Sequence, residues 1–198
     1  MEVLEAMDTC TAMRYFKEEP VPREDLEKLI YAATRASNPG NSQGWEFVVI
    51  DDENLKNLIG EVVLQGMAPA FANKPEGLDG VGERMYLGAE HLANNFAKVP
   101  AWILGASRKI YPPHAPEDVF MHSTIYPAGQ NLIVAARSMN IGTCFTTFHR
   151  SAEPIIRKLC NVPEDVHLCL FVAVGYPERK FMPVRRKPLE NVLHWNTF

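Results

Sequence analysis

The stretch Arg23–Ile50, REDLEKLIYAATRASNPGNSQGWEFVVI, holds the pattern that decides the fold. Its first half predicts a helix from Arg23 to Ala36, because apolar residues recur at i, i+3, i+4 and i+7 from Leu26 onward. The polar segment that follows, with a Pro-Gly pair, predicts a loop. Trp45–Ile50 is aromatic and β-branched and predicts a strand.

Helices and strands alternate in the same way along the rest of the chain. Further helices are predicted at residues 2–13, 53–65, 85–97, 117–139 and 151–160, and further strands at 99–104 and 167–174. Pro127 either kinks the helix at 117–139 or marks its true start. Residues 66–84 and 111–116 are poorly periodic, and 66–84 predicts an irregular excursion or lid. Because helices separate the strands, the fold class is α/β or α+β.

Length and composition limit the protein to a few classes. The 198 residues are 46% hydrophobic with a formal net charge of −4, which fits one globular domain over residues 1–198. The acidic balance argues against broad nucleic-acid binding, and no apolar run is long enough for a membrane helix. The opening residues carry acids where a secretory leader needs basic ones. Four cysteines without CxxC spacing favour buried free thiols over a metal or redox site, and a cytoplasmic location.

Three polar or basic clusters are candidates for binding chemistry. Arg14 is either a solvated arginine or an anion contact, because a guanidinium forks onto phosphate oxygens. The loop at 37–45 is either an ordinary connection or a set of amide and hydroxyl groups that reads the edge of a polar heterocycle. Five of the nine residues from Arg179 to Lys187 are basic, and Arg185–Arg186 is a second candidate phosphate site.

Other sites that depend on short motifs are not supported. The sequence has no GxGxxG or GxxxxGK[ST] cradle for a nucleotide, no HExxH and no GxSxG. Its six histidines are scattered without the spacing of metal ligands. We therefore expect no metal site, and we interpret His122 and His149 as structural residues rather than catalytic bases.

Taken in order, several segments resemble the FMN-dependent nitroreductase family across nearly the whole chain. The segments are TAMRYF with PVP (11–16 and 20–22), ASNPGNSQGW (36–45), VP (99–100), PAGQNLIVAAR (127–137), GYP (175–177) and RRKPL with HW (185–189 and 194–195). Each is weak alone, but six in the right order make a specific match. The resemblance implies an α+β fold, with a mostly antiparallel central sheet flanked by helices, and a homodimer with a long central interface helix.

The same resemblance implies two shared FMN sites and names the residues that would hold the cofactor. Arg14 and Arg186 fall on phosphate contacts, and the 145–148 segment falls on the stretch near the flavin N5. The implied cofactor-binding residues are Thr11, Arg14, Ser37, Asn38, Asn41, Gln43, Phe145, Thr146, Thr147, Arg185 and Arg186. Two departures matter: Thr11 and Ala12 stand where the family often has arginine and serine, so a phosphate contact is missing, and Gly44 replaces a proline. Arg185 is a candidate replacement for the missing contact.

The implied activity is an oxidoreductase that uses NADH or NADPH to reduce nitroaromatics, quinones or related electron-poor molecules by a ping-pong mechanism. The flavin would carry the chemistry, so no catalytic side-chain acid or base is expected. The excursions at about 65–90 and 108–124 would form the substrate wall, unless their apolar residues are ordinary core or dimer contacts. The candidate wall residues are Phe71, Met85, Tyr86, Tyr111, Phe120 and Met121. Two alternatives stay open: a reductive dehalogenase of the same fold, and a non-catalytic flavin-binding or storage protein.

Overall fold

A four-stranded sheet forms the centre of the computed structural model, which describes residues 1–198. The strands are β1 (Trp45–Ile50), β2 (Ala101–Arg108), β3 (Gly142–Thr146) and β4 (Val166–Gly175), arranged in the order β1-β2-β4-β3. All three neighbouring pairs are antiparallel. The expected mixed architecture with an antiparallel sheet is therefore confirmed.

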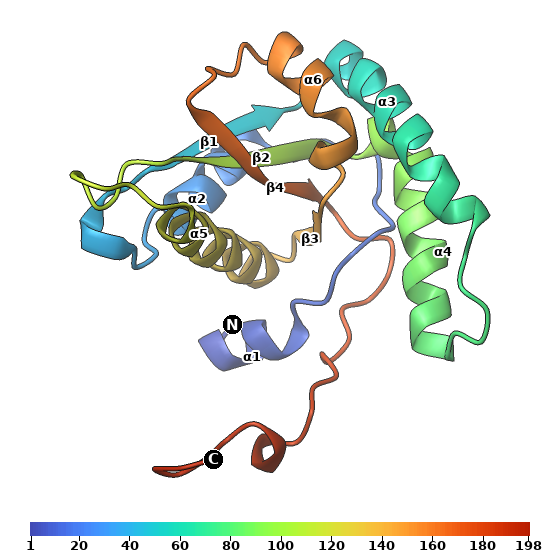
Figure 1. Ribbon diagram of the computed structural model, residues 1–198. Coiled ribbons are helices and arrows are strands. Elements are labelled where there is room, and N and C mark those ends of the chain that lie inside the picture. Colours follow the sequence, from blue (N-terminus) through green and yellow to red (C-terminus); the bar gives the residue numbers. More distant parts are fainter.

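Helices cover both faces of this sheet (Figure 1). They are α1 (Val3–Thr9), α2 (Arg23–Ala33), α3 (Glu53–Ala72), α4 (Gly80–Asn94), α5 (Asp118–Ser138) and α6 (His149–Leu159). Side chains of β2 alternate between two cores: Trp102 packs with residues of α3, α4 and α6, whereas Ile103 packs with residues of α2 and α5. Because both faces are covered, the two central strands are almost wholly buried.

The expected irregular excursion at 66–84 is wrong for most of its length. Helix α3 continues to Ala72 and α4 starts at Gly80, so only residues 73–79 form a loop. Each helix starts at an aspartate whose carboxylate accepts a backbone N–H three residues on: Asp52 from Leu55 and Asp79 from Gly82. Such caps stabilise a helix start even where the apolar period behind it is weak.

Smaller differences concern three other elements. Helix α1 ends at Thr9 rather than at residue 13, and β3 is a strand that the sequence patterns did not predict. Helix α5 spans the expected range and contains Pro127 in its interior, so the proline does not mark its start. No helix is both long and apolar enough to span a bilayer. All four cysteines are free thiols, and burial raises the pKa of the Cys169 thiol to about 11.

Candidate functional site

Arg14 is held between the edge of the sheet and α4. Residues 10–17, which follow α1, form what we call the N-terminal segment. The backbone N–H of Met13 in this segment donates to the carbonyl of Thr143 over 2.8 Å, which fixes the segment along β3. On its other side the half-buried Arg14 side chain lies across Gly88 of α4, where a Cβ atom would come within 2.8 Å of its Cδ. The lack of a side chain at Gly88 therefore makes room for Arg14.

The C-terminal tail, residues 176–198, follows β4 and runs back to the N-terminal segment. The N–H of Glu178 donates to the carbonyl of Tyr15 over 3.0 Å, and the N–H of Val184 donates to the carbonyl of Asp8 over 2.7 Å. These bonds attach the tail to the N-terminal segment both before and after residues 179–183. Residues 8–17 and 176–184 therefore lie side by side, as Figure 1 shows.

Arg137, in the last turn of α5, ties this arrangement to the core. Its Nε donates to the Thr9 hydroxyl over 2.8 Å, and its guanidinium carbon lies 4.1 Å from the centre of the Phe181 ring. One buried arginine thus contacts the end of α1 and the tail together.

A cavity of about 610 Å³ lies between the N-terminal segment, α4 and the tail. We call it the cationic cavity, because six of its lining residues are basic and none is acidic. None of the six forms an ion pair with a carboxylate of this chain. The basic residues are Arg14, Arg84, Arg179, Lys180, Arg185 and Arg186. An anion such as a phosphate is the complement of such a site.

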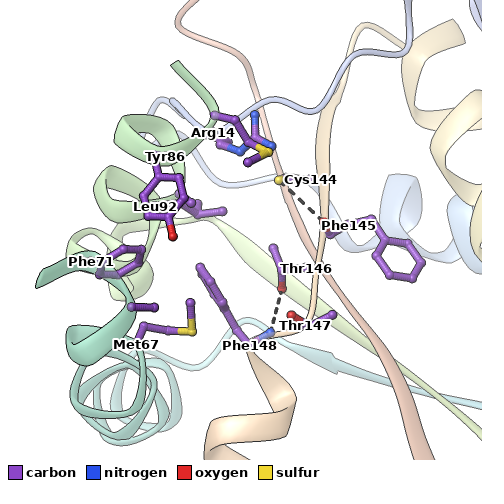
Figure 2. Close-up of a pocket in the computed structure, with 13 residues that line it drawn as sticks. Arg14, Met67, Phe71, Tyr86, Leu92, Cys144, Phe145, Thr146, Thr147 and Phe148 are labelled. Carbon is purple, nitrogen blue, oxygen red and sulfur yellow. Dashed lines mark hydrogen bonds between the residues drawn. The ribbon is translucent and has the colours of Figure 1, made fainter. Parts of the chain in front are cut away.

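A second cavity of about 310 Å³ adjoins the first, and the two share Arg14 and Met85. We call it the apolar cavity, because ten of its thirteen lining residues are hydrophobic and Arg14 is its only charged one. Figure 2 shows side chains of α3 and α4 facing the end of β3 across it. Its walls are Met67, Ala70 and Phe71 of α3, Met85, Tyr86, Ala89 and Leu92 of α4, and residues 144–148.

The two threonines on the β3 side differ in what they can donate. The Thr146 hydroxyl donates to the carbonyl of Phe171 over 2.9 Å, so its proton is already used inside the fold. Neither the backbone N–H nor the hydroxyl of the exposed Thr147 has a hydrogen-bond partner within the chain. Burial raises the pKa of the Cys144 thiol, with partial compensation from the Arg14 charge, so this thiol is a neutral part of the wall. Thr147 is therefore the free donor at this edge.

Seven of the expected cofactor residues line the two adjoining cavities, and the other four form a separate group in the loop at 37–43. Thr11, Arg14, Arg185 and Arg186 line the cationic cavity, and Phe145, Thr146 and Thr147 line the apolar one. The expected loop residues Ser37, Asn38, Asn41 and Gln43 line neither. Within that loop, the side-chain amide oxygen (Oδ1) of Asn38 accepts from the backbone N–H of Gln43, which holds the turn closed.

The loop lies at the opposite end of α5 from the arginines. Gly40 lies against the ring of Tyr111, which packs edge-on against Phe120 in the first turn of α5, whereas Arg137 in its last turn contacts the Thr9 hydroxyl. A helix of 21 residues is about 30 Å long at about 1.5 Å per residue. One chain therefore does not bring both groups to one small ligand.

The residues expected to form the substrate wall lie in two different places. Phe71, Met85 and Tyr86 line the apolar cavity, whereas Tyr111 and Phe120 pack on each other and Met121 is buried in the core with α2. The residues that sequence reasoning missed are Met67, Leu92 and Arg84. They lie on α3 and α4. Residues 66–84 have no regular apolar period that could have identified Met67 and Arg84, whereas Leu92 lies within the helix predicted at 85–97.

The structure contains no cluster of side chains that could form a metal site. No group of three or more His, Cys, Asp or Glu side chains is placed to hold a metal ion. His149, at the start of α6, is buried, its Nδ1 has no partner, and burial lowers its pKa. This environment keeps the imidazole neutral inside the fold.

Comparison with known proteins identifies the family. The profile of the nitroreductase family matches residues 10–176. An iodotyrosine deiodinase of Thermotoga neapolitana is 27% identical, over 94% of this chain and 93% of its own length. The oxidized iodotyrosine deiodinase structure with bound FMN and 3-iodo-L-tyrosine has a TM-score of 0.80 at 22% identity, over all of both chains. A mutant of the FMN and NADPH-dependent nitroreductase NfnB, from sphigopyxis sp. strain HMH, has a TM-score of 0.77 at 21% identity, also over all of both chains.

These structural neighbours establish the fold, and the profile match covers most of the chain. The matched range begins just before Arg14 and ends at Tyr176, whose carbonyl accepts from the backbone N–H of Lys17. The chain therefore belongs to the nitroreductase family of FMN-dependent oxidoreductases.

Proposed function

We propose that this chain binds FMN and transfers electrons from NADH or NADPH to nitroaromatics, quinones or similar electron-poor small molecules. The observation that carries the proposal is the pair of adjoining cavities, one cationic and one apolar, with Arg14 between them. FMN has a phosphate at one end and a flat ring system at the other, so its two ends match the two cavities in chemistry. When bound, FMN would supply the redox chemistry, accepting two electrons from a donor and releasing them to an acceptor.

Residues of both cavities would hold FMN. Arg14, Arg185 and Arg186 would bind the phosphate, since charge-assisted hydrogen bonds from a guanidinium to phosphate oxygens are among the stronger polar contacts in proteins. The unused N–H and hydroxyl of Thr147 would donate to the edge of the ring. We further propose that residues 1–198 form a single domain, in which the stretches at about 65–90 and 108–124 act as a lid over the site.

The site also calls for a second copy of the chain. If the loop at 37–43 contacts the flavin, it has to do so from a partner subunit, because it lies at the far end of α5 from Arg14. Large apolar side chains are exposed on α1 and along the tail, among them Leu4, Leu189 and Trp195. Exposed apolar residues of this size are typical of surfaces that bind another protein. We therefore propose a homodimer with shared flavin sites, located in the cytoplasm.

The apolar cavity favours flat substrates without a positive charge. Phe71 and Tyr86 offer aromatic faces, and the lining of the cavity includes no carboxylate that could pair with an ammonium group. The relatives named iodotyrosine deiodinase support reductive dehalogenation as the second candidate. A zwitterionic amino acid would need two opposite charges, whereas Arg14 is the only charged residue that lines the cavity. Nitroaromatics and quinones therefore fit better.

Steady-state turnover of a substrate panel by the FMN-loaded protein tests this proposal. The panel pairs a neutral nitroaromatic and a quinone with 3-iodo-L-tyrosine and with an iodophenol that lacks the amino-acid group. We expect the first two to be reduced fastest, and Tyr86→Ala to raise their KM values. Leu87→Ala, an exposed neighbour on α4 outside the cavity lining, is the matched control. Preferred turnover of 3-iodo-L-tyrosine would establish the dehalogenase instead, and no turnover of any acceptor would favour flavin storage.

A further inference from the structure

The cationic cavity holds more positive charge than one flavin phosphate uses. A phosphate monoester carries about 1.5 to 2 negative charges at neutral pH, whereas six cations line the cavity. None of them is neutralised by a carboxylate of the chain. This occurs in a protein whose formal charge is −4. A cavity with only the FMN phosphate bound would thus stay strongly positive and attract further anions.

Arg84 is the surplus cation with the clearest position. It projects from α4 one turn before Gly88, and its neighbour Met85 lines both cavities. Arg84 is exposed and makes no hydrogen bond or ion pair within the chain. Its guanidinium is therefore available to a ligand that extends from the apolar cavity along α4.

Arg179 and Lys180 line the same cavity as Arg84 and belong to the tail. The guanidinium carbon of Arg179 lies 3.3 Å from the centre of the Tyr15 ring, and Tyr15 stacks on His91 at 4.2 Å. A stacked arginine keeps its N–H edge free to donate while its face is held, which preorganises it for an anion. Lys180 follows it directly on the exposed tail.

We propose that Arg84, with Arg179 and Lys180, forms a second anion subsite that binds the 2′-phosphate of NADPH and so makes NADPH the preferred donor. This inference rests on the proposed function, because it assigns the donor of that same site. With the nicotinamide stacked on a flavin ring bound at the apolar cavity, the rest of the dinucleotide would pass Met85 toward Arg84. The flavin phosphate and the donor diphosphate together carry about four negative charges, and the 2′-phosphate adds about two more. The total then matches the six cations.

Anaerobic stopped-flow reduction of the FMN-loaded protein by NADPH and by NADH tests the subsite. We expect NADPH to reduce the flavin at least about tenfold more efficiently than NADH, as loss of one charge-assisted contact predicts. Arg84→Gln should lower the efficiency with NADPH about tenfold more than that with NADH. Arg150→Gln, an exposed arginine on α6 outside both cavities, should keep the preference of the native protein.

Adenosine 2′,5′-bisphosphate provides an independent probe of the same phosphate. It should compete with NADPH in the native protein and lose most of its inhibition in Arg84→Gln, whereas 5′-AMP should inhibit weakly in both. Equal use of NADPH and NADH would overturn the subsite and leave the proposed function intact. Loss of FMN from Arg84→Gln would also overturn it, since Arg84 would then serve the flavin phosphate. A flavin that dithionite reduces but neither nucleotide reduces would overturn the subsite and the proposed donor together.

Discussion

Arg14 crosses α4 at Gly88, and a Cβ atom there would lie 2.8 Å from the Arg14 Cδ. In a helix, alanine in place of glycine adds roughly 0.5 to 1 kcal/mol of stability, but here the Arg14 side chain would have to move. We therefore expect Gly88→Ala to leave the melting temperature unchanged or higher while it weakens FMN binding. Fluorescence titration with FMN and thermal unfolding measure the two effects separately. Gly82→Ala, at the start of the same helix, should not weaken FMN binding, and equal losses in both variants would contradict the account.

Arg186 is the tail residue that should contribute most directly to the phosphate contact. Arg186→Ala removes one hydrogen bond to a charged group, so FMN binding should weaken by about 1.5 to 3 kcal/mol. The dissociation constant from fluorescence quenching gives this difference. Lys187→Ala, an exposed neighbour that does not line the cationic cavity, should change it little. An unchanged FMN affinity in Arg186→Ala would mean that the arginine is only solvated.

Thr146 and Thr147 should respond oppositely to the same substitution. Thr146→Val removes the buried hydrogen bond to the Phe171 carbonyl and should lower the free energy of unfolding by about 1 to 3 kcal/mol. Thr147→Val removes a hydroxyl that has no partner in the chain, so stability should hold while the flavin reduction potential shifts. Denaturant unfolding and a redox titration separate the two. If Thr147→Val unfolds more easily than Thr146→Val, the assignment of donors along this edge is wrong.

His149 should make the fold sensitive to acid. Burial lowers its pKa below the usual 6.5 in the folded state, so the unfolded chain binds this proton more readily. Its contribution to stability is therefore complete above pH of about 6.5 and is lost as the pH falls through the depressed folded pKa. His149→Phe should flatten the pH dependence of the unfolding free energy below pH of about 6.5, while His114→Phe, at an exposed loop position, should leave it as it is. A native slope in His149→Phe would contradict this.

Local periodicity predicted the elements whose apolar faces meet the sheet. The helices α2 and α5 pack against β2 and β4 through regular apolar stripes, and both were expected within a few residues. The end of α3 and the start of α4 instead border a cavity, so the pattern there is irregular although the backbone is helical. Strand β3 has only five residues, and its pairing with β4 and the contact of Met13 with Thr143 are long-range interactions that the local pattern does not contain.

The structure brings the two predicted arginines to one cavity, whereas it separates the residues expected to form the substrate wall. The resemblance paired Arg14 with Arg186 although 171 residues separate them, and both line one cavity. That cavity forms because backbone bonds from the tail to Tyr15 and Asp8 close it. Arg84 was missed because the segment around it was interpreted as irregular. The loop at 37–43 was assigned to the same cofactor, but within a single chain this loop lines neither cavity.

The most direct test of the central claim is anaerobic visible spectroscopy of the FMN-reconstituted protein. We predict a yellow protein whose flavin absorbance bleaches when NADPH is added and returns when a quinone is added afterwards. Arg14→Ala should retain less FMN under the same washing conditions, because Arg14 lines both cavities. A chain that stays colourless after reconstitution with FMN would contradict the account.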